Sequence, residues 1–182
     1  MLVRAATEHE LPAIERLYER TIAAMRGTPY DICWEMGVHP TSERLRNAAR
    51  AGNLLVAVEG DGGVAPVLGA LILDDNQAAG YRDIPWGIDA VPERVCVIHL
   101  LAVDPDVRGR GVGRALMAGA FDAARAQEAE AVRLDVFDNN RSAYNLYNTC
   151  GFVDLGVYTL DVGDGFTHAA NLMEYDLRGE AR

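Results

Sequence analysis

The chain has 182 residues, of which 49% are hydrophobic and 24% charged, and its formal net charge at pH 7 is −10. These values exclude a disordered chain and suit one globular domain with a full core. The acidic balance argues against nucleic acid as a partner, because phosphate backbones are bound by clustered Lys and Arg. It suits a cationic partner such as an amine, although plain solubility is an equally simple reason for the charge.

Neither the cysteines nor the histidines form a recognisable site. Cys33, Cys96 and Cys150 are odd in number and widely spaced, so neither a disulfide framework nor a zinc site is predicted. The four histidines show no ligand spacing, and we expect no metal. No signal peptide is visible, and no apolar run approaches the ~20 residues that span a membrane. We therefore expect a cytoplasmic protein with reduced thiols and no membrane partner.

The first fifty residues predict a short strand and two helices. A strand over residues 2–6 leads into Thr7-Glu8-His9-Glu10, which has the S/T-x-x-E form of a capping box. The helix that follows has an apolar face and ends at Gly27. A second helix runs from Ser42 to about Arg50 and is closed by Gly52.

A hairpin and a long irregular stretch come next. Residues 54–59 and 66–73 read as strands around the turn signal at residues 60–63. Residues 74–94 show no clear period. A loop of this length in a compact domain is usually functional or mobile.

A glycine-rich loop then joins a buried strand to a helix. The apolar run from Val95 to Val103 is interrupted only by His99 and is stopped by Asp104-Pro105, which cannot continue a sheet ladder. After a short polar loop comes Arg108-Gly109-Arg110-Gly111-Val112-Gly113, and the helical pattern that follows extends to about Glu128. The glycine loop therefore lies at a helix N-terminus.

This junction favours an anion. Glycines let backbone N–H groups approach a ligand, and the first turn of a helix offers free donors and partial positive charge. Arg108, Arg110 and Arg114 add full charges suited to phosphate oxygens. The dinucleotide fingerprint would need a glycine in place of Arg114, and no P-loop motif occurs. A phosphate-bearing ligand of another kind is expected, and the alternative is a tight turn with solvated arginines.

The last part of the chain predicts one more strand, a short helix and a closing hairpin. The strand covers residues 132–137, and Asp138-Asn139-Asn140 caps a helix that ends at Gly151. Residues 152–160 and 168–177 read as a hairpin around residues 163–165. No repeat or linker is visible, so residues 1–182 are expected to form a single mixed α/β domain.

Two motifs together point to a family. The pattern L-x-V-x-P at Leu101, Val103 and Pro105, followed by R-x-x-G-x-G from Arg108, resembles the coenzyme A loop of the GNAT superfamily of N-acetyltransferases. The downstream stretch from Leu134 to Phe152 resembles that family's L-[DE]-V…N-x-x-A-x-x-L-Y-x-x-x-G-F element.

The resemblance implies an α/β fold of the α+β type. Its centre would be a mixed, mostly antiparallel twisted sheet of about seven strands with helices on both faces. A splayed parallel strand pair would hold acetyl-CoA, and the pantetheine arm would bond to backbone as an added strand does. The residues implied in coenzyme binding are Leu101, Ala102, Val103, Arg108, Gly109, Arg110, Gly111, Val112, Gly113, Arg114, Asn140, Ala143 and Tyr147. The first three can equally be ordinary core residues, and Asn140 can simply cap its helix.

The resemblance also implies the reaction. Acetyl would pass from acetyl-CoA to a primary amine by direct attack, without a covalent enzyme intermediate. Tyr147 would donate a proton to the leaving thiolate, and the alternative is an aromatic packed beside Leu146. Asp135 stands where ribosomal-protein N-terminal acetyltransferases carry a glutamate, one methylene longer. Asp135 and His99 are both candidates for the base, and His99 can instead be a hydrogen-bonded core residue.

The amine acceptor is left open by the sequence. Trp34 and Glu35, together with Tyr81, Asp83 and Trp86, could form an acidic, aromatic-walled pocket for a cation. Another acyl-CoA donor, or a catalytically silent domain that senses acyl-CoA, are the alternative functions. The terminal hairpin could pair across a homodimer, as sheet edges do.

Overall fold

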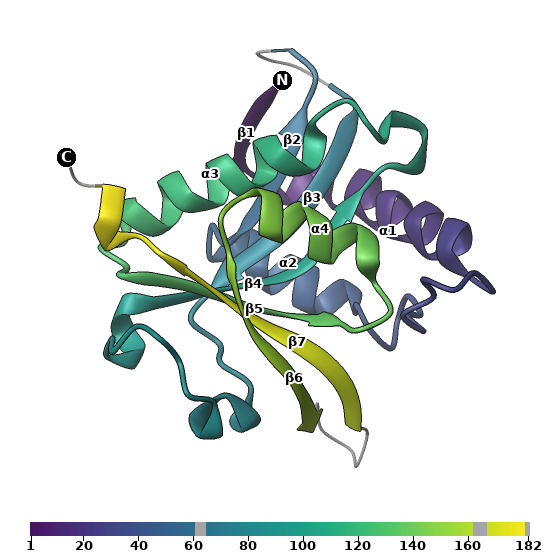
Figure 1. Cartoon of the computed structure of the whole chain (residues 1–182). Coiled ribbons are helices and arrows are strands. Elements are labelled where there is room, and N and C mark those ends of the chain that lie inside the picture. Colours follow the sequence, from purple (N-terminus) through teal and green to yellow (C-terminus); the bar gives the residue numbers. More distant parts are fainter. Residues whose placement is uncertain (61–64, 162–166, 181–182) are drawn as a thin grey trace. The chain divides into compact units, whose positions relative to one another are not determined.

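The structure is a computed structural model that describes residues 1–60, 65–161 and 167–180. Its secondary structure is shown in Figure 1. The strands are β1 (Leu2–Ala5), β2 (Leu54–Val58), β3 (Val67–Asp74), β4 (Val95–Val103), β5 (Ala131–Phe137), β6 (Val153–Asp161) and β7 (Thr167–Asp176). The helices are α1 (Leu11–Met25), α2 (Ser42–Arg50), α3 (Val112–Ala126) and α4 (Arg141–Thr149). Short 3₁₀ segments are η1 (Glu8–Glu10), η2 (Ala79–Asp83), η3 (Pro92–Arg94), η4 (Pro105–Val107) and η5 (Arg178–Glu180).

The strands form a mixed sheet of the predicted kind. Their hydrogen-bonded order is β1-β2-β3-β4-β5-β7-β6, in seven strands. The pairs β1/β2, β2/β3, β5/β7 and β6/β7 are antiparallel, and β4/β5 is parallel. The parallel ladder is short, since it joins residues 95–97 to residues 131–133 and goes no further in the described strands. This confirms a mixed, mostly antiparallel sheet that contains the parallel pair β4/β5.

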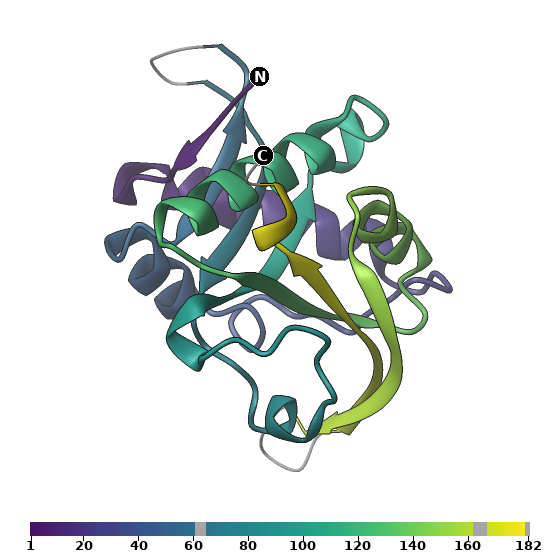
Figure 2. The same cartoon turned by 60° about the vertical axis from the view of Figure 1, so that its left-hand side comes forward.

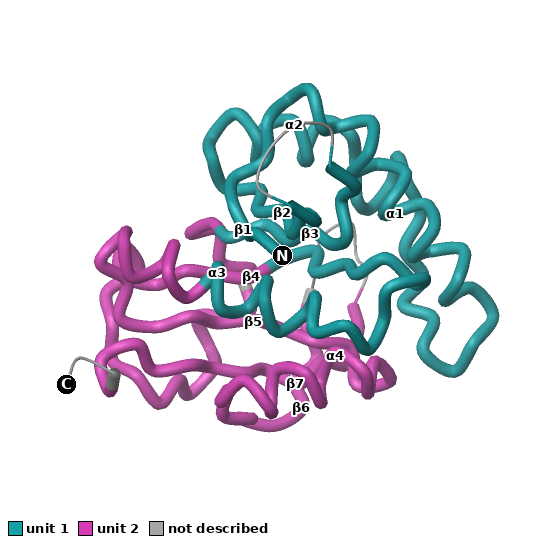
Figure 3. The backbone as a smooth tube through the Cα atoms, turned by 90° about the horizontal axis from the view of Figure 1, so that it is seen from above, with its two compact units in different colours: residues 1–73, 99–120 teal, residues 74–98, 121–182 magenta. Residues whose placement is uncertain are grey.

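The chain divides into two compact units, which are coloured separately in Figure 3. Unit 1 comprises residues 1–73 and 99–120, and unit 2 comprises residues 74–98 and 121–182. Strand β4 contributes residues to both units. The single domain expected from the sequence stays a prediction.

Unit 1 carries helices on both faces of its strands (Figure 2). The apolar faces of α1 and α2 pack with alternate residues of β2, as the burial of Ile14, Leu45 and Val56 shows. Helix α3 covers the opposite face so closely that a Cβ on Gly69 would lie 2.9 Å from Leu116 Cδ1 of the helix and 2.9 Å from the Ala102 carbonyl oxygen of β4. A side chain at residue 69 would therefore push the helix and strand apart.

Unit 2 is built on β5, β7 and β6. Strands β6 and β7 run side by side as a long ribbon in Figures 1 and 2. A second core forms on this sheet, and the irregular segment of residues 74–94 contributes Tyr81, Ile84 and Ile88 to it. The segment predicted to lack a period is therefore irregular, yet three of its side chains are fully packed.

Most predicted boundaries are confirmed. Helix α2 and strand β4 lie where the sequence placed them, and the Thr7 N–H donates to Glu10 Oε2 at 2.9 Å, as a capping box requires. Residues 61–63 and 163–165, which were predicted as turns, lie outside the described residues. None of the described helices is long and apolar enough to cross a membrane.

Candidate functional site

In unit 1 the second half of β4 is distorted. Leu100 has φ +53°, a left-handed backbone conformation that is uncommon for a residue other than glycine. Its carbonyl oxygen accepts a hydrogen bond of 2.7 Å from the buried hydroxyl of Tyr18. Beyond Leu100, Ala102 is buried, and Leu101 and Val103 are half-buried. The hydrogen bond from α1 therefore holds the strand out of regular pleat at the start of the predicted pantetheine segment.

The glycine loop follows this strand directly. Gly109 and Gly111 have φ +80° and +81°, which only glycine adopts without strain. A Cβ on either residue would meet nothing within 4 Å, so the loop presents open backbone. The backbone amides there donate to no acceptor among the residues that the structure describes. They are those of Gly109, Gly111, Val112, Gly113 and Arg114.

Free amides at the start of α3 fit a phosphate, because helix N-termini combine such donors with partial positive charge. Arg108 and Arg114 are exposed and have no ion-pair partner in the described part of the chain. Arg110 differs, because its Nη2 lies 2.8 Å from Glu59 Oε1. Since both side chains are more than half exposed, that pair is weak and could be exchanged for a phosphate.

In unit 2 a polar cluster surrounds Asp135 on β5. Its Oδ1 accepts a hydrogen bond of 2.7 Å from the hydroxyl of Tyr81, and its Oδ2 lies 3.8 Å from Nε2 of His168. Burial, followed by the charge of Asp135, raises the pKa of Tyr81 well above its ordinary value, so Tyr81 stays a donor. His168 was missed in the sequence. Only the β5/β7 register, in which Phe137 pairs with Ala170, shows that it approaches Asp135.

Tyr147 lies on α4 and is 5% exposed. Burial, and then the negative charge of Asp135, raise the pKa of Tyr147 above the ordinary value of a phenol. Its hydroxyl makes no hydrogen bond to any of the described residues. The structure therefore brings Tyr147 and Asp135 into one electrostatic environment, in which the phenol stays neutral.

Asn140 and Ala143 lie at the start of the same helix. Asn140 is the N-cap of α4, and its Oδ1 accepts a hydrogen bond from the backbone N–H of Ala143 at 3.3 Å. This confirms the capping role. Contact of either residue with a coenzyme stays a prediction.

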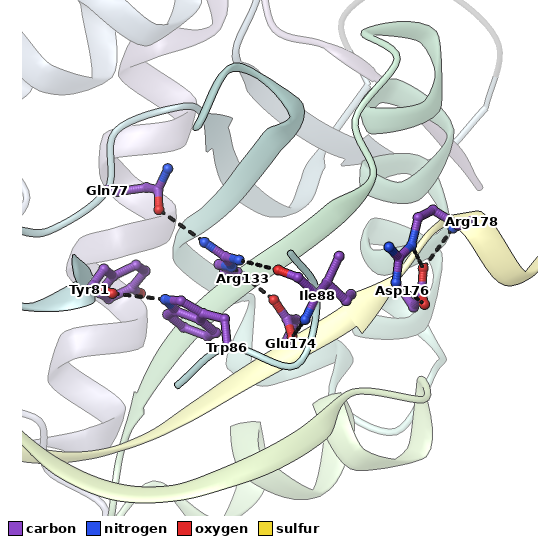
Figure 4. Close-up of polar contacts among 8 residues, drawn as sticks. All are labelled: Gln77, Tyr81, Trp86, Ile88, Arg133, Glu174, Asp176 and Arg178. Carbon is purple, nitrogen blue, oxygen red and sulfur yellow. Dashed lines mark hydrogen bonds and ion pairs between the residues drawn. The ribbon is translucent and has the colours of Figure 1, made fainter. Parts of the chain in front are cut away.

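A buried ion pair anchors the irregular segment beside this cluster (Figure 4). Arg133 Nε lies 2.9 Å from Glu174 Oε1, and the two side chains are 7% and 4% exposed. Arg133 also donates to the Ile88 carbonyl at 3.0 Å, while the Ile88 N–H donates to Glu174 at 3.0 Å. The guanidinium lies 4.4 Å from the ring centroid of Trp86, whose Nε1 donates to the Tyr81 carbonyl at 2.8 Å. The pair therefore holds the segment that carries Tyr81.

The predicted substrate residues fall in both units. Tyr81 and Trp86 lie together in unit 2, with ring centroids 5.2 Å apart, and Asp83 is exposed nearby in the chain. Trp34 and Glu35 belong to unit 1, where the ring of Trp34 is half-buried on the core formed with α1. Because Trp86 already has an internal cation against its ring, a role in binding a substrate cation stays a prediction.

His99 and Cys96 lie on opposite halves of β4. His99 is half-buried in unit 1, and its role as a base stays a prediction. Cys96 is buried in unit 2, and burial raises the pKa of its thiol to about 11. A thiol with such a pKa is a poor nucleophile near neutral pH. The described residues contain no group of three or more metal-ligating side chains.

Parts of the sequence are similar to those of known proteins. The N-alpha-acetyltransferase RimI of Mycobacterium tuberculosis is 35% identical over 74 residues, which are 38% of this chain and 45% of that protein. Mycothiol acetyltransferase of Beutenbergia cavernae is 37% identical over 101 residues, which are 55% of this chain and 33% of that protein. The chain thus spans less than half the length of either relative.

Solved structures share the fold over nearly the whole chain. A GCN5-related N-acetyltransferase from Kribbella flavida superposes with a TM-score of 0.68 at 23% identity, covering 96% of each chain. The structure of yncA from Salmonella typhimurium with its cofactor acetyl-CoA gives a TM-score of 0.67 at 20% identity, covering 100% of this chain and 96% of the other. A sequence model of the acetyltransferase (GNAT) family matches residues 15–152. The chain therefore belongs to the acetyltransferase (GNAT) family.

Proposed function

We propose that the chain transfers the acetyl group of acetyl-CoA to a primary amine by direct attack on the thioester. The observation that carries this proposal is the set of free amides between Gly109 and Arg114, which suits a diphosphate at the N-terminus of α3. The relatives named as acetyltransferases, and the fold shared with a structure that holds acetyl-CoA, support the same donor.

The coenzyme is proposed to bind largely through backbone. Leu101, Ala102 and Val103 would hold the pantetheine arm as an added strand, and the irregular backbone at Leu100 supports this, because it frees the strand from regular pairing. Arg108 and Arg114 would reach the phosphates as unpaired cations, and Arg110 would exchange Glu59 for a phosphate.

Tyr147 is proposed to pass a proton to the leaving thiolate. Its raised pKa limits how it can do so, because a thiol has an ordinary pKa of about 8.5 and a phenol of about 10. Giving a proton to the thiolate therefore costs at least about 2 kcal/mol if the phenol is left as an anion. The cost disappears if Tyr147 regains a proton from the attacking nitrogen. We infer that Tyr147 shuttles a proton and is not itself left ionised.

The acceptor is proposed to be a cation. By sequence, unit 2 holds sixteen Asp and Glu against seven Arg, a net charge of −9, while unit 1 holds eleven against ten, a net charge of −1. The excess of negative charge thus lies in the unit that carries Asp135 and Tyr147. Such a field attracts ammonium groups and raises their local concentration. Peptide N-termini, lysine side chains and small amines all fit this class.

An amine library with acetyl-CoA, read by thiol release and by the mass of the acetylated amine, tests the proposal. Saturable acetylation of a cationic amine is expected, and no acetylated product from any amine would contradict it. The chain contains no lysine, so no lysine of the enzyme itself can be acetylated in this assay. Assays with succinyl-CoA and propionyl-CoA in place of acetyl-CoA test the alternative acyl donors. Binding of acyl-CoA without any turnover would favour a catalytically silent domain that senses acyl-CoA.

The remaining proposals concern the location, the partners and the oligomeric state of the protein. We propose a cytoplasmic enzyme with no metal and no nucleic acid or membrane partner. A homodimer would use β6, which lies at the end of the strand order and exposes Val153 and Val157. Light scattering across a concentration series tests the dimer, and a strictly monomeric mass would remove it.

A further inference from the structure

His168 is buried in an unusual way. Its side chain is 14% exposed, and Nε2 is fully buried with no hydrogen-bond partner among the described residues. Such a nitrogen is normally satisfied in a folded protein, and one that is not needs an explanation. The carboxylate of Asp135 is its charged neighbour, at 3.8 Å from Nε2 to Oδ2.

Two contacts fix the geometry of this pair. The His168 ring stacks on Phe137, with centroids 4.0 Å apart and planes 13° apart, which sets the direction of Nε2. The Tyr81 hydroxyl holds the other carboxylate oxygen, Oδ1, at 2.7 Å. His168 Nε2 therefore lies beside Oδ2 while Tyr81 holds Oδ1, and Asp135 keeps 25% of its side chain exposed.

We propose that Asp135 and His168 act together as the proton acceptor for the amine, with His168 as a positioning and relay residue behind Asp135. This inference rests on the proposed function. Asp135 meets the substrate ammonium, an N–H bond breaks, and the proton passes through Oδ2 to Nε2 of His168. The amine lone pair then forms the C–N bond, and the C–S bond breaks with its electron pair on sulfur. Tyr147 protonates the sulfur and regains a proton from the nitrogen, and His168 later returns its proton through Asp135, whose side chain is 25% exposed, to water.

The basicity of the two groups explains why the pair is needed. A carboxylate has an ordinary pKa of about 3.9 and an imidazole of about 6.5, so an imidazole holds a proton about 400 times more strongly. General bases work best when their pKa lies near the working pH. A carboxylate by itself is a weak base near pH 7, so a neighbouring imidazole gives the proton a more basic acceptor.

Among the ionisable groups near His168, the carboxylate of Asp135 is the partner proposed to exchange a proton with it. Strand β5 contributes Asp135, η2 contributes Tyr81 through Asp135, and α4 contributes Tyr147, whose pKa is raised in part by Asp135. Strand β6 places apolar Leu160 opposite His168 in the ladder. Both tyrosines stay neutral, so the carboxylate is the charge that His168 meets.

The test uses the full chain carrying His168→Gln, with His9→Gln as a matched control, because His9 is exposed on η1. With an amine from the library, His168→Gln should lose about 100-fold in kcat near pH 7, while its affinity for acetyl-CoA stays unchanged. The loss should shrink to a few-fold at pH 9.5, where more of the amine is already neutral. A purely structural role would give a loss that does not depend on pH.

Three results would overturn the inference. They are wild-type turnover in His168→Gln at pH 7, a loss that is equal at all pH values, or the same pH-dependent loss in His99→Gln but not in His168→Gln. In each case wild-type turnover and acetyl-CoA binding remain, so the proposed function stands. If His168→Gln does not fold, Asp135→Asn decides by the same pH profile. If the wild-type chain does not bind acetyl-CoA, the proposed function and the inference both fall.

Discussion

The hydroxyl of Tyr81 donates a 2.7 Å hydrogen bond to Asp135, across 54 positions of sequence. Tyr81 is 2% exposed, and its backbone carbonyl is held by Trp86, whose ring faces Arg133 of the buried ion pair. The irregular segment of unit 2 therefore orients the carboxylate that we place at the amine. The segment thus contributes a side chain that orients Asp135.

Replacing Tyr81 with Phe should lower the free energy of unfolding by about 1.5–3 kcal/mol, the usual worth of a hydrogen bond to a charged group. Turnover should fall about tenfold, because Asp135 loses the contact that directs Oδ2, an effect of about 1.4 kcal/mol. Urea unfolding and initial rates check the two effects. Acetyl-CoA affinity should not change, and a variant that loses affinity but keeps its turnover would show that this interpretation is wrong.

Tyr147→Phe should reduce kcat by ~10²–10⁴, the range for loss of a proton-transferring group. Stability should be preserved, because the Tyr147 hydroxyl has no hydrogen bond to the described residues to lose. Rapid-quench turnover and thermal unfolding measure both quantities. Tyr158→Phe on β6 is the control, and equal rates in the two variants would remove Tyr147 from the mechanism.

Arg114→Ala should weaken acetyl-CoA binding about 5- to 30-fold, or about 1–2 kcal/mol, because an exposed charge-assisted contact to phosphate is lost. Binding of S-acetylpantetheine, which lacks the diphosphate, should be the same in wild type and variant. Calorimetry with both ligands measures the difference. The control is Arg46→Ala, on the exposed face of α2. If Arg114→Ala weakened the binding of both ligands equally, Arg114 would not contact the diphosphate.

Stability should fall in alkaline solution. Burial raises the pKa of Tyr18, Tyr81 and Tyr147 in the folded chain, whereas unfolded tyrosines ionise near pH 10. Above pH 10 the unfolded state therefore holds fewer protons, and each tyrosine should cost about 1.4 kcal/mol of stability per pH unit. Below pH 10 these groups contribute no pH dependence. Urea midpoints between pH 8 and 11 measure the slope, which Tyr147→Phe should reduce by one tyrosine's share.

Glu174→Gln should lower the free energy of unfolding by about 3–5 kcal/mol, because it leaves the buried guanidinium of Arg133 without its counter-charge. Replacing both residues with apolar ones of similar volume should cost less than the single change. Chemical unfolding of the single and double variants gives the coupling energy. Additive effects would mean that the two side chains act independently.

The sequence predicts the part of the candidate site whose residues lie close together along the chain. The glycine loop could be identified because the apolar run to Val103, the glycines and the helical pattern lie within about twenty-five residues. Helix α2 was equally readable, since the Thr41 hydroxyl accepts from the Arg44 N–H at 3.1 Å and Gly52 ends the helix at φ +76°.

The other half depends on pairs that are distant in sequence. Arg133 and Glu174 are 41 positions apart, and only the β5/β7 register joins them. His168 reaches Asp135 through the same register, which a sequence pattern does not specify until the turn before β7 is known. The contact of the Arg133 guanidinium with the Trp86 ring is likewise not specified by any local pattern, and a role of Trp86 in binding a substrate cation stays a prediction.

The most direct measurement of the central claim is a calorimetric titration of the intact chain with acetyl-CoA. We predict saturable binding with one site per chain, weakened by Gly111→Ala, because a side chain at φ +81° strains the loop whose amides we propose to hold the diphosphate. An absence of heat and of saturation in the wild-type chain would contradict the account, and the acetyltransferase function proposed for this GNAT chain would fail with it.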